Sequence, residues 1–364
     1  MLGFSILIIL YLLFYFILII GWRNTQKKMI TTKAKSTLKC DELTVVVAFR
    51  NEYHNLSILL KNIDRLKILP SKFIFVNDHS QDDWSELFEK KNPDLIATYS
   101  LNEAAFGKKS AIQEGVKRAA TKYILCWDAD IQFENNYFTD IQKLEVADLI
   151  VLPVHFESKN IVQSLGEIDF YLANFVNQAS AYWQRPIMCN GANLLFEKNA
   201  YLESINLNAH AHILSGDDMF LLRHMIMQNK KVYCASNQLC RITTQSPSSF
   251  LGYISQRTLW FGKSLLIKDG LLNFWAIVQF IFTVSFFSFF IYWILEDPKT
   301  FGILFLIKCV VDLSFLSLYF FSIKKNILTF LIPFYGLIFP FYNLFILFSF
   351  YFKKQKWKGR KLYQ

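Results

Sequence analysis

Four long apolar runs constrain this chain most, because each is long enough to cross a bilayer as a helix. The first, residues 2–21, carries no charge, and the other three, 271–295, 301–322 and 328–352, lie in the last third of the sequence. Hydrophobic residues make up 53% of the 364 residues, too large a share for a purely soluble protein. The sequence therefore predicts an integral membrane protein whose first run is an uncleaved anchor.

Between the first run and the others, charged and apolar residues mix as they do in a globular domain. Arg23 and the lysines after it place this domain on the cytoplasmic side of the cytoplasmic membrane under the positive-inside rule. The expected division is an anchor at 1–22, a globular domain at 44–248, an amphipathic interface segment at 249–268, a membrane region of three apolar segments at 271–352 and a basic tail at 353–364.

The last apolar run conflicts with a simple count of spans. Three full spans after the domain would place the basic tail outside the cell, against the positive-inside rule. Pro333 and Pro340 interrupt this run, so we expect it to be re-entrant or to lie in the membrane interface. In the run before it, Lys308 and Asp312 are four residues apart, a spacing that predicts a neutralised structural pair on one helical face rather than a proton path.

Net charge and cysteine content exclude other classes of protein. The formal charge of +10 is concentrated beside the membrane segments, where attraction to anionic headgroups explains it. No RNA-binding signature and no zinc-finger spacing is present, so we expect no nucleic-acid partner. The six cysteines lack metal-ligand spacing, which favours reduced, buried thiols in a cytosolic domain.

Within the globular domain, short apolar runs that read as strands alternate with segments of helical periodicity. Residues 44–49, 73–76 and 123–126 are the strands, and each is followed by a polar cluster. Helical patterns follow the first strand, recur through Trp84 and precede the third strand at residues 108–120. This alternation predicts an α/β fold with a mostly parallel central sheet, whose strand ends share one edge.

Asp128 and Asp130 follow the third of these strands directly. Two carboxylates one residue apart suit Mg²⁺ or Mn²⁺, which usually take substrate phosphates as further ligands. A metal-bound, phosphorylated donor is therefore the first functional hypothesis. An Asp-x-Asp alone is also common in surface loops, so the hypothesis depends on the other motifs.

Six short motifs occur in the order seen in family 2 glycosyltransferases, and together they resemble that family over residues 44–263. They are residues 45–52, 76–82, Gly107-Lys108, 128–130, 190–193 and 216–218. The resemblance implies a GT-A nucleotide-binding fold, a nucleotide-sugar donor such as a UDP- or GDP-sugar, a divalent metal, and inversion at the anomeric carbon.

Carried over to this chain, the resemblance assigns roles at the donor. It places Ala48, Arg50 and Glu52 in the nucleotide pocket and gives the base to Asp78. The family more often has two acidic residues where this chain has Asn77-Asp78, a change that could alter base preference. The remaining donor-side residues follow: Lys108 at the diphosphate, where a helix N-terminus also favours anions, Asp128 at the sugar nucleotide and as a metal ligand, and Asp130 at the metal.

An inverting transfer also needs one base for the acceptor hydroxyl. Residues 215–222 resemble the family's acidic motif, which makes Asp218 the chosen base and Asp217 the alternative. Without the resemblance, two acidic residues before an apolar helical run are more typical of a helix cap. Both interpretations can hold together, because a cap fixes a carboxylate without preventing it from acting as a base.

Two further segments are assigned to the acceptor. Asn190, Gly191 and Asn193 resemble the loop that borders the donor sugar, although a simple turn explains them as well. Gln256, Arg257 and Trp260 resemble the Gln-x-x-Arg-Trp signature of processive members, but Leu259 stands where the arginine should be. We therefore expect transfer of one or a few sugars. The same stretch, 250–266, also predicts an amphipathic membrane-surface helix with Arg257 among the headgroups.

The sequence thus predicts a membrane-bound, metal-dependent inverting glycosyltransferase that acts on a lipid-linked or membrane-proximal glycan acceptor. Two alternatives remain at this point. One is a non-catalytic scaffold or regulatory subunit that retains a nucleotide-binding fold. The other is a transporter, which only Lys308 and Asp312 support.

Overall fold

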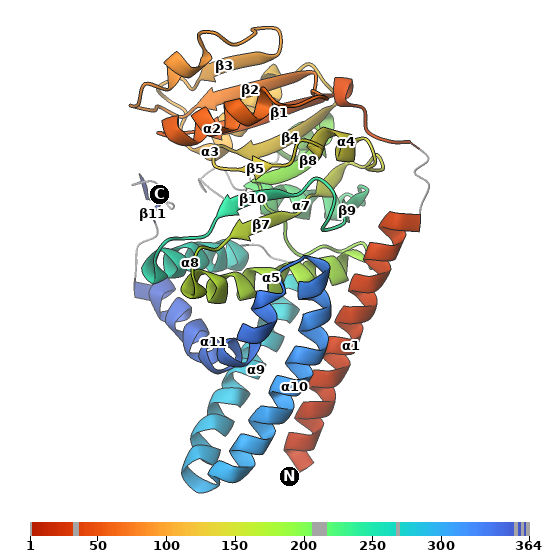
Figure 1. Ribbon diagram of the computed structural model, residues 1–364, viewed down its shortest axis with the longest axis vertical. Coiled ribbons are helices and arrows are strands. Elements are labelled where there is room, and N and C mark those ends of the chain that lie inside the picture. The colour runs from red at the N-terminus through yellow and green to blue at the C-terminus, as the bar shows by residue number, and fades with distance from the viewer. Residues whose placement is uncertain are drawn as a thin grey trace. The chain divides into compact units, whose positions relative to one another are not determined.

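The computed structural model describes residues 2–31, 36–205, 217–266, 270–352, 356–357 and 360–361 (Figure 1). Its contacts divide the chain into two compact units. The helical unit comprises Met1–Asn24, Ser158–Trp183 and Ser246–Gly359, and the sheet unit comprises Thr25–Glu157, Gln184–Gln245 and Arg360–Gln364. The helix at 161–181 therefore groups with the apolar helices rather than with the sheet, a division that differs from the one expected from the sequence.

The sheet unit is built on a seven-stranded sheet with the strand order β3-β2-β1-β4-β8-β6-β9. Only β8 runs antiparallel to its neighbours, so the predicted mostly parallel α/β sheet is confirmed. The strands are β1 (Leu43–Phe49), β2 (Lys72–Asn77), β3 (Ile96–Ser100), β4 (Tyr123–Asp128), β6 (Leu149–Val151), β8 (Asn193–Glu197) and β9 (Val232–Cys234).

The middle residues of the central strands are almost all apolar and buried, as expected for a sheet that is covered on both faces. Val45, Val46 and Val47 of β1 are fully buried. Helix α3 (Lys108–Arg118) packs on β1 so closely that a methyl group at Gly115 would lie 2.4 Å from Cγ1 of Val46. A glycine at this point of the helix is what allows the close approach.

The remaining elements of the sheet unit are short. Its helices are α2 (Tyr53–Ile63), α3 (Lys108–Arg118), α4 (Tyr137–Ile141), α6 (Lys198–Ile205) and α7 (Asp217–Met227), with the 3-10 turns η1 (Cys40–Glu42) and η2 (Trp84–Phe88). The helical pattern expected through Trp84 is only the turn η2. A second sheet has the order β5-β10-β7, from β5 (Gln132–Phe133), β10 (Ile242–Gln245) and β7 (Val154–Glu157). Two further short strands lie near the end of the sequence: β11 (Lys356–Trp357), which belongs to the helical unit, and β12 (Arg360–Lys361).

The helical unit contains long apolar helices. Its elements are α1 (Leu2–Thr31, which continues into the sheet unit), α5 (Ile161–Ala181), α8 (Phe250–Leu266), α9 (Gly270–Glu296), α10 (Pro298–Ser322) and α11 (Ile327–Phe352). Among the described residues, three stretches are long and apolar enough to cross a membrane: Ile9–Lys27, Gly302–Ser322 and Ile327–Phe352. A shorter apolar stretch, Asn273–Ser285, lies in α9.

Helix α11 contains both Pro333 and Pro340. A proline within a helix removes one backbone hydrogen bond and kinks the axis. In Figure 1, α11 (dark blue) bends near its middle, and its second half runs back along α8. Aromatic contacts between Phe250 and Phe345 and between Phe261 and Phe350 join these two helices. A re-entrant or interfacial course for this segment remains a prediction.

The predicted pair within the apolar helices is present. Lys308 Nζ lies 2.6 Å from Asp312 Oδ2 on α10. The other carboxylate oxygen accepts hydrogen bonds from the hydroxyls of Tyr11 and Tyr15 on α1, the latter at 2.9 Å. The charge of Asp312 is therefore compensated by an ammonium group and two hydroxyls, as a charge among apolar helices requires.

We expect Gly115→Ala to lower the stability of the sheet unit by about 1–3 kcal/mol, because the added methyl group must displace α3 or the buried Val46. Thermal unfolding of the purified protein in detergent, followed by circular dichroism, measures this as a lower midpoint. Gly302→Ala is the matched control, since nothing lies within 4 Å of a methyl group there. Equal midpoints for the two variants would contradict the predicted clash.

Candidate active site

The ends of β1, β2 and β4 form one edge of the sheet. Ala48 of β1 lies between Val76 of β2 and Asp128 of β4 in the strand register. In parallel sheets the carboxyl ends of strands, where the order of strands reverses, are the usual ligand-binding edge. The segments that follow these strands carry the residues predicted to bind the donor.

The loops after β1 and β2 are tied together by backbone and side-chain hydrogen bonds. The Asn51 amide N–H donates to Ser80 Oγ at 2.9 Å, and the Gln81 amide N–H donates to Asn51 Oδ1 at 2.8 Å. Arg50 Nη1 donates to the Asp78 carbonyl oxygen at 3.5 Å, and Asp78 itself is buried. Arg50 and Asp78, which the resemblance assigns to the nucleotide, thus lie side by side.

Lys108 is the first residue of α3, and its ammonium forms an ion pair with the Asp128 carboxylate. It also lies beside the loop at Gly191. A methyl group built on Gly191 would be 3.6 Å from Lys108 Nζ and 3.5 Å from Asp218 Oδ2. Side chains from α3, β4 and α7 therefore meet around one glycine. We call Lys108, Asp128, Gly191 and Asp218 the Lys108 group.

The carboxylate of Asp218 is held by two backbone N–H groups. The Gly191 N–H donates to Oδ2 at 3.0 Å, and the Met219 N–H donates to Oδ1 at 2.9 Å. The second bond satisfies one of the open N–H groups in the first turn of α7 from within the helix, so a role of Asp218 as the helix cap stays a prediction. Residues 215 and 216 lie outside the described residues, and only the backbone of Asp217 is described.

Asp130 lies two residues after Asp128 and accepts a hydrogen bond from Thr244 Oγ1 at 3.1 Å. Although part of its side chain is exposed, the protein around it and then the negative charge of Asp128 raise the pKa of Asp130, and Glu52 adds to the effect. Negative charge therefore gathers at this edge of the sheet, which favours binding of a cation.

These carboxylates fit a divalent metal that is shared with a substrate. Among the residues that the structure describes, no three His, Cys, Asp or Glu side chains form a complete metal site. Mg²⁺ and Mn²⁺ prefer oxygen ligands, and Mg²⁺ is usually held by one or two carboxylates together with phosphates. Asp128 and Asp130 supply that number of ligands and leave the rest to a diphosphate.

The loop from Asn190 to Asn193 is a turn, and the side chain of Asn193 does not lie where an acceptor-side residue is expected. The Ala192 N–H donates to Asn190 Oδ1 at 3.0 Å, and the Asn193 N–H donates to the Asn190 carbonyl oxygen at 3.1 Å. Asn193 is fully buried: its Nδ2 donates to the carbonyl oxygens of Pro153 and Cys240, and its Oδ1 accepts from the Tyr137 hydroxyl. Its side chain supports the fold and does not face an acceptor.

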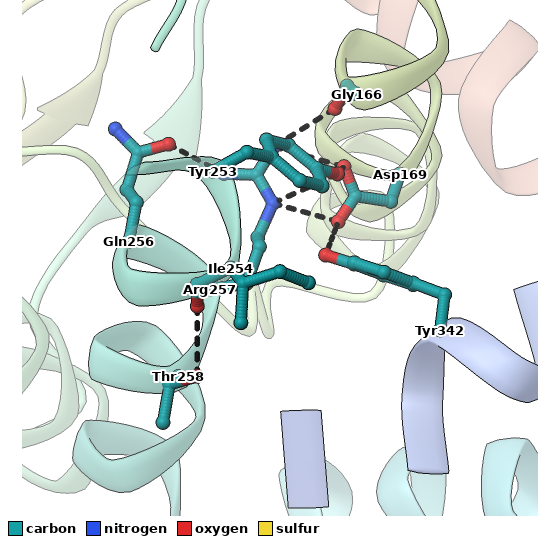
Figure 2. Close-up of polar contacts among 8 residues, drawn as sticks. All are labelled: Gly166, Asp169, Tyr253, Ile254, Gln256, Arg257, Thr258 and Tyr342. Carbon is teal, nitrogen blue, oxygen red and sulfur yellow. Dashed lines mark hydrogen bonds and ion pairs between the residues drawn. The ribbon is translucent and has the colours of Figure 1, made fainter. Parts of the chain in front are cut away.

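Arg257 is likewise held inside the helical unit, so its predicted place among lipid headgroups is wrong. The side chain is 6% exposed and forms a two-pronged ion pair with Asp169, Nε to Oδ2 at 2.6 Å and Nη2 to Oδ1 at 2.8 Å. Figure 2 shows the hydroxyls of Tyr253 and Tyr342 reaching the same carboxylate from α8 and α11. The Asp169 carboxylate of α5 therefore joins three helices, because it accepts hydrogen bonds from α8 and from α11.

The other two residues of the degenerate signature surround this guanidinium. Arg257 Nη1 donates to Gln256 Oε1 at 2.9 Å, and the guanidinium lies 4.1 Å from the centre of the Trp260 ring. An acceptor role for Gln256 and Trp260 remains a prediction. Sequence reasoning missed Asp169, because nothing in the pattern around it pointed to a buried partner, and it missed Thr244 in the same way.

The predicted state of the cysteines is confirmed among the described residues. All six cysteines are free and buried. Burial raises the pKa of the Cys40 thiol to about 11 and that of Cys234 to about 12, so these thiols are protonated at neutral pH. They have no part in the site.

Comparison with known proteins agrees with this geometry. The chain has the GT-A fold, as does a mannosyltransferase from Pyrobaculum calidifontis that was solved in complex with GDP-Man and Mn²⁺. The two structures superpose with a TM-score of 0.58 at 14% sequence identity, covering 96% of this chain and 98% of the other. At this identity the likeness shows the fold alone.

The family model described as Glycosyl transferase family 2 matches residues 44–198. Poly-beta-1,6-N-acetyl-D-glucosamine synthase of Staphylococcus aureus (strain COL) is 33% identical over 111 residues, which are 29% of this chain and 26% of that protein. The synthase of the same name from Staphylococcus epidermidis is 29% identical over 97 residues, 26% of this chain and 23% of that protein. The match thus spans about a quarter of these relatives. Residues 44–198 are thus similar to family 2 glycosyltransferases, in agreement with the resemblance read from the motifs.

We expect Asn193→Leu to destabilise the protein strongly, because two carbonyl groups and the Tyr137 hydroxyl lose a buried partner. Each such group costs about 1–3 kcal/mol. The measurement is the yield and thermal midpoint of the purified variant. Asn190→Ala is the control in the same loop, and we expect it to fold. A stable Asn193→Leu protein that is impaired only in its KM for acceptor would restore the acceptor-side role.

Proposed function

We propose that this protein is a membrane-bound inverting glycosyltransferase that moves a sugar from a UDP- or GDP-sugar to a lipid-linked or membrane-proximal acceptor, with a divalent metal. The observation that carries the proposal is the Lys108 group. It brings together one ammonium and two carboxylates from three separate parts of the chain. A diphosphate, its cation and an acceptor hydroxyl need this combination of charges in one place.

The donor is expected to lie along the edge formed by β1, β2 and β4. Arg50 and the buried Asp78, which are joined by a hydrogen bond, suit the base end of the nucleotide. Ala48 and Glu52 lie on the same edge. Lys108 begins α3, and the N-terminus of a helix favours anions, so the diphosphate is placed there.

Asp128 and Asp130 would hold the metal, which supplies positive charge where the leaving nucleoside diphosphate gains negative charge. Magnesium and manganese are both consistent with these ligands. Lys108 adds a second positive charge beside Asp128. Thr244 orients the carboxylate of Asp130 through its hydrogen bond.

Asp218 is the proposed base. Its two oxygens accept hydrogen bonds from the backbone N–H groups of Gly191 and Met219. These bonds fix the carboxylate and leave its other lone pairs available to an acceptor hydroxyl. In an inverting transfer the base removes the proton of the attacking hydroxyl on the face opposite the leaving group. Gly191 has no side chain, so an acceptor hydroxyl can approach Asp218 past the backbone of the loop.

The acceptor and the side of the membrane follow from the flanking segments. The apolar helices keep the protein in a bilayer, which favours an acceptor that is itself held there. The basic residues after the first span favour the cytoplasmic side for the sheet unit. The relatives are named as synthases of a polymer, but Leu259 stands in place of the signature arginine, and we propose transfer of one or a few sugars.

We expect Asp130→Asn and Asp218→Asn each to reduce transfer by at least about a hundredfold, since one removes charge at the metal and the other removes the base. The assay incubates the full-length protein with radiolabelled UDP- and GDP-sugars and a total lipid extract, with and without Mn²⁺. Release of nucleoside diphosphate is measured alongside incorporation of label.

Asp94→Asn is the control, because this aspartate is exposed and lies outside the site. We expect it to behave as the native protein. Full transfer by both Asp130→Asn and Asp218→Asn, in protein with a native thermal midpoint, would end the proposal.

A further inference from the structure

The ammonium of Lys108 forms an ion pair with the carboxylate of Asp128, which is also a proposed ligand of the metal. It pairs with Asp128, and both side chains are partly exposed, at 27% for Lys108 and 33% for Asp128. The same ammonium lies next to Gly191, whose amide N–H holds Asp218. One positive charge therefore stands among the carboxylates of the site.

A divalent cation and this ammonium compete for the same negative charge. The Coulomb attraction of Asp128 for a cation is reduced while Lys108 neutralises it. Asp130, which lies two residues after Asp128 and accepts a hydrogen bond from Thr244, offers only one further carboxylate. The protein alone is therefore a poor metal site as long as Lys108 stays on Asp128.

We propose that Lys108 couples the binding of the metal to the binding of the donor by exchanging Asp128 for the diphosphate. This inference rests on the proposed function and adds to it that the donor and the metal bind in a coupled way. Lys108 is a binding residue with two alternative anionic partners, the Asp128 carboxylate and the diphosphate of the donor. The metal gains full access to Asp128 only when the diphosphate is bound.

Two features of α3 favour the exchange. Lys108 is its first residue and Gly107, with φ 93°, is its N-cap, so the open N–H groups of the first turn lie beside the lysine. A diphosphate at this helix end carries more charge than one carboxylate and attracts the ammonium more strongly. Because binding free energies are linked, the factor by which a diphosphate improves metal affinity equals the factor by which the metal improves diphosphate affinity.

The test compares Lys108→Met with Lys109→Met in the full-length protein in detergent. Lys109→Met removes the same charge one residue along the helix. Titration calorimetry with Mn²⁺ alone should give an affinity about twofold to fivefold higher for Lys108→Met than for Lys109→Met and the native protein, the gain expected from removing a partly exposed ion pair. This titration requires neither sugar transfer nor an acceptor.

The second arm repeats the Mn²⁺ titration with saturating UDP and, separately, saturating GDP. In the native protein the active nucleotide should strengthen Mn²⁺ binding, and in Lys108→Met this gain should shrink by a similar factor of about twofold to fivefold. Lys108→Arg, which keeps the charge and the pairing, should retain the native coupling. It also shows whether an effect of Lys108→Met comes from misfolding.

Equal or weaker Mn²⁺ binding by Lys108→Met, or an undiminished nucleotide effect, would overturn the coupling while leaving the proposed function intact. The proposed function fails in a different way. In that case the native protein binds no Mn²⁺ with either nucleotide and releases no nucleoside diphosphate in the transfer assay.

Discussion

The whole site depends on three parallel strands ending side by side. The central strands are buried on both faces, so only their ends can carry polar groups at low cost. Asp128 ends β4, and the Arg50 and Asp78 loops follow β1 and β2. Burial of the valines in β1 thus fixes the place of charged residues that are more than seventy positions apart in sequence.

Sequence reasoning succeeded where a signal is local. The strands before Asp78 and Asp128, the helix that begins at Lys108 and the Lys308–Asp312 spacing are all readable from a few neighbouring residues. It failed where a residue's partner is distant. Asn193 looks like a loop residue, yet its partners are Tyr137, Pro153 and Cys240. The small β5-β10-β7 sheet was missed for a further reason: its strands are only two to four residues long and show no periodicity.

Helix α5, in the helical unit, also contains residues whose partners lie far along the chain and were not predicted from the sequence. It carries the buried Glu167 and the partly buried Asp169, although acidic residues are usually expected at the surface. Each has a cationic partner far along the chain: Lys325 lies 3.2 Å from Glu167, and Arg257 pairs with Asp169. Burial still raises the pKa of Glu167, while Lys325 opposes that rise. Removing one member of such a pair costs more than the pair contributes, because the other charge is left buried.

The arrangement around Asp312 has a consequence for biogenesis. A lone aspartate at the centre of a membrane helix costs about 2.5–3.5 kcal/mol, and the pairing with Lys308 on the same helix offsets part of that cost. The carboxylate's hydroxyl partners, Tyr11 and Tyr15, lie about three hundred residues earlier in the chain. The hydrogen bonds of this carboxylate are therefore complete only after the first helix and α10 have packed together, so the two ends of the helical unit depend on each other for their final assembly.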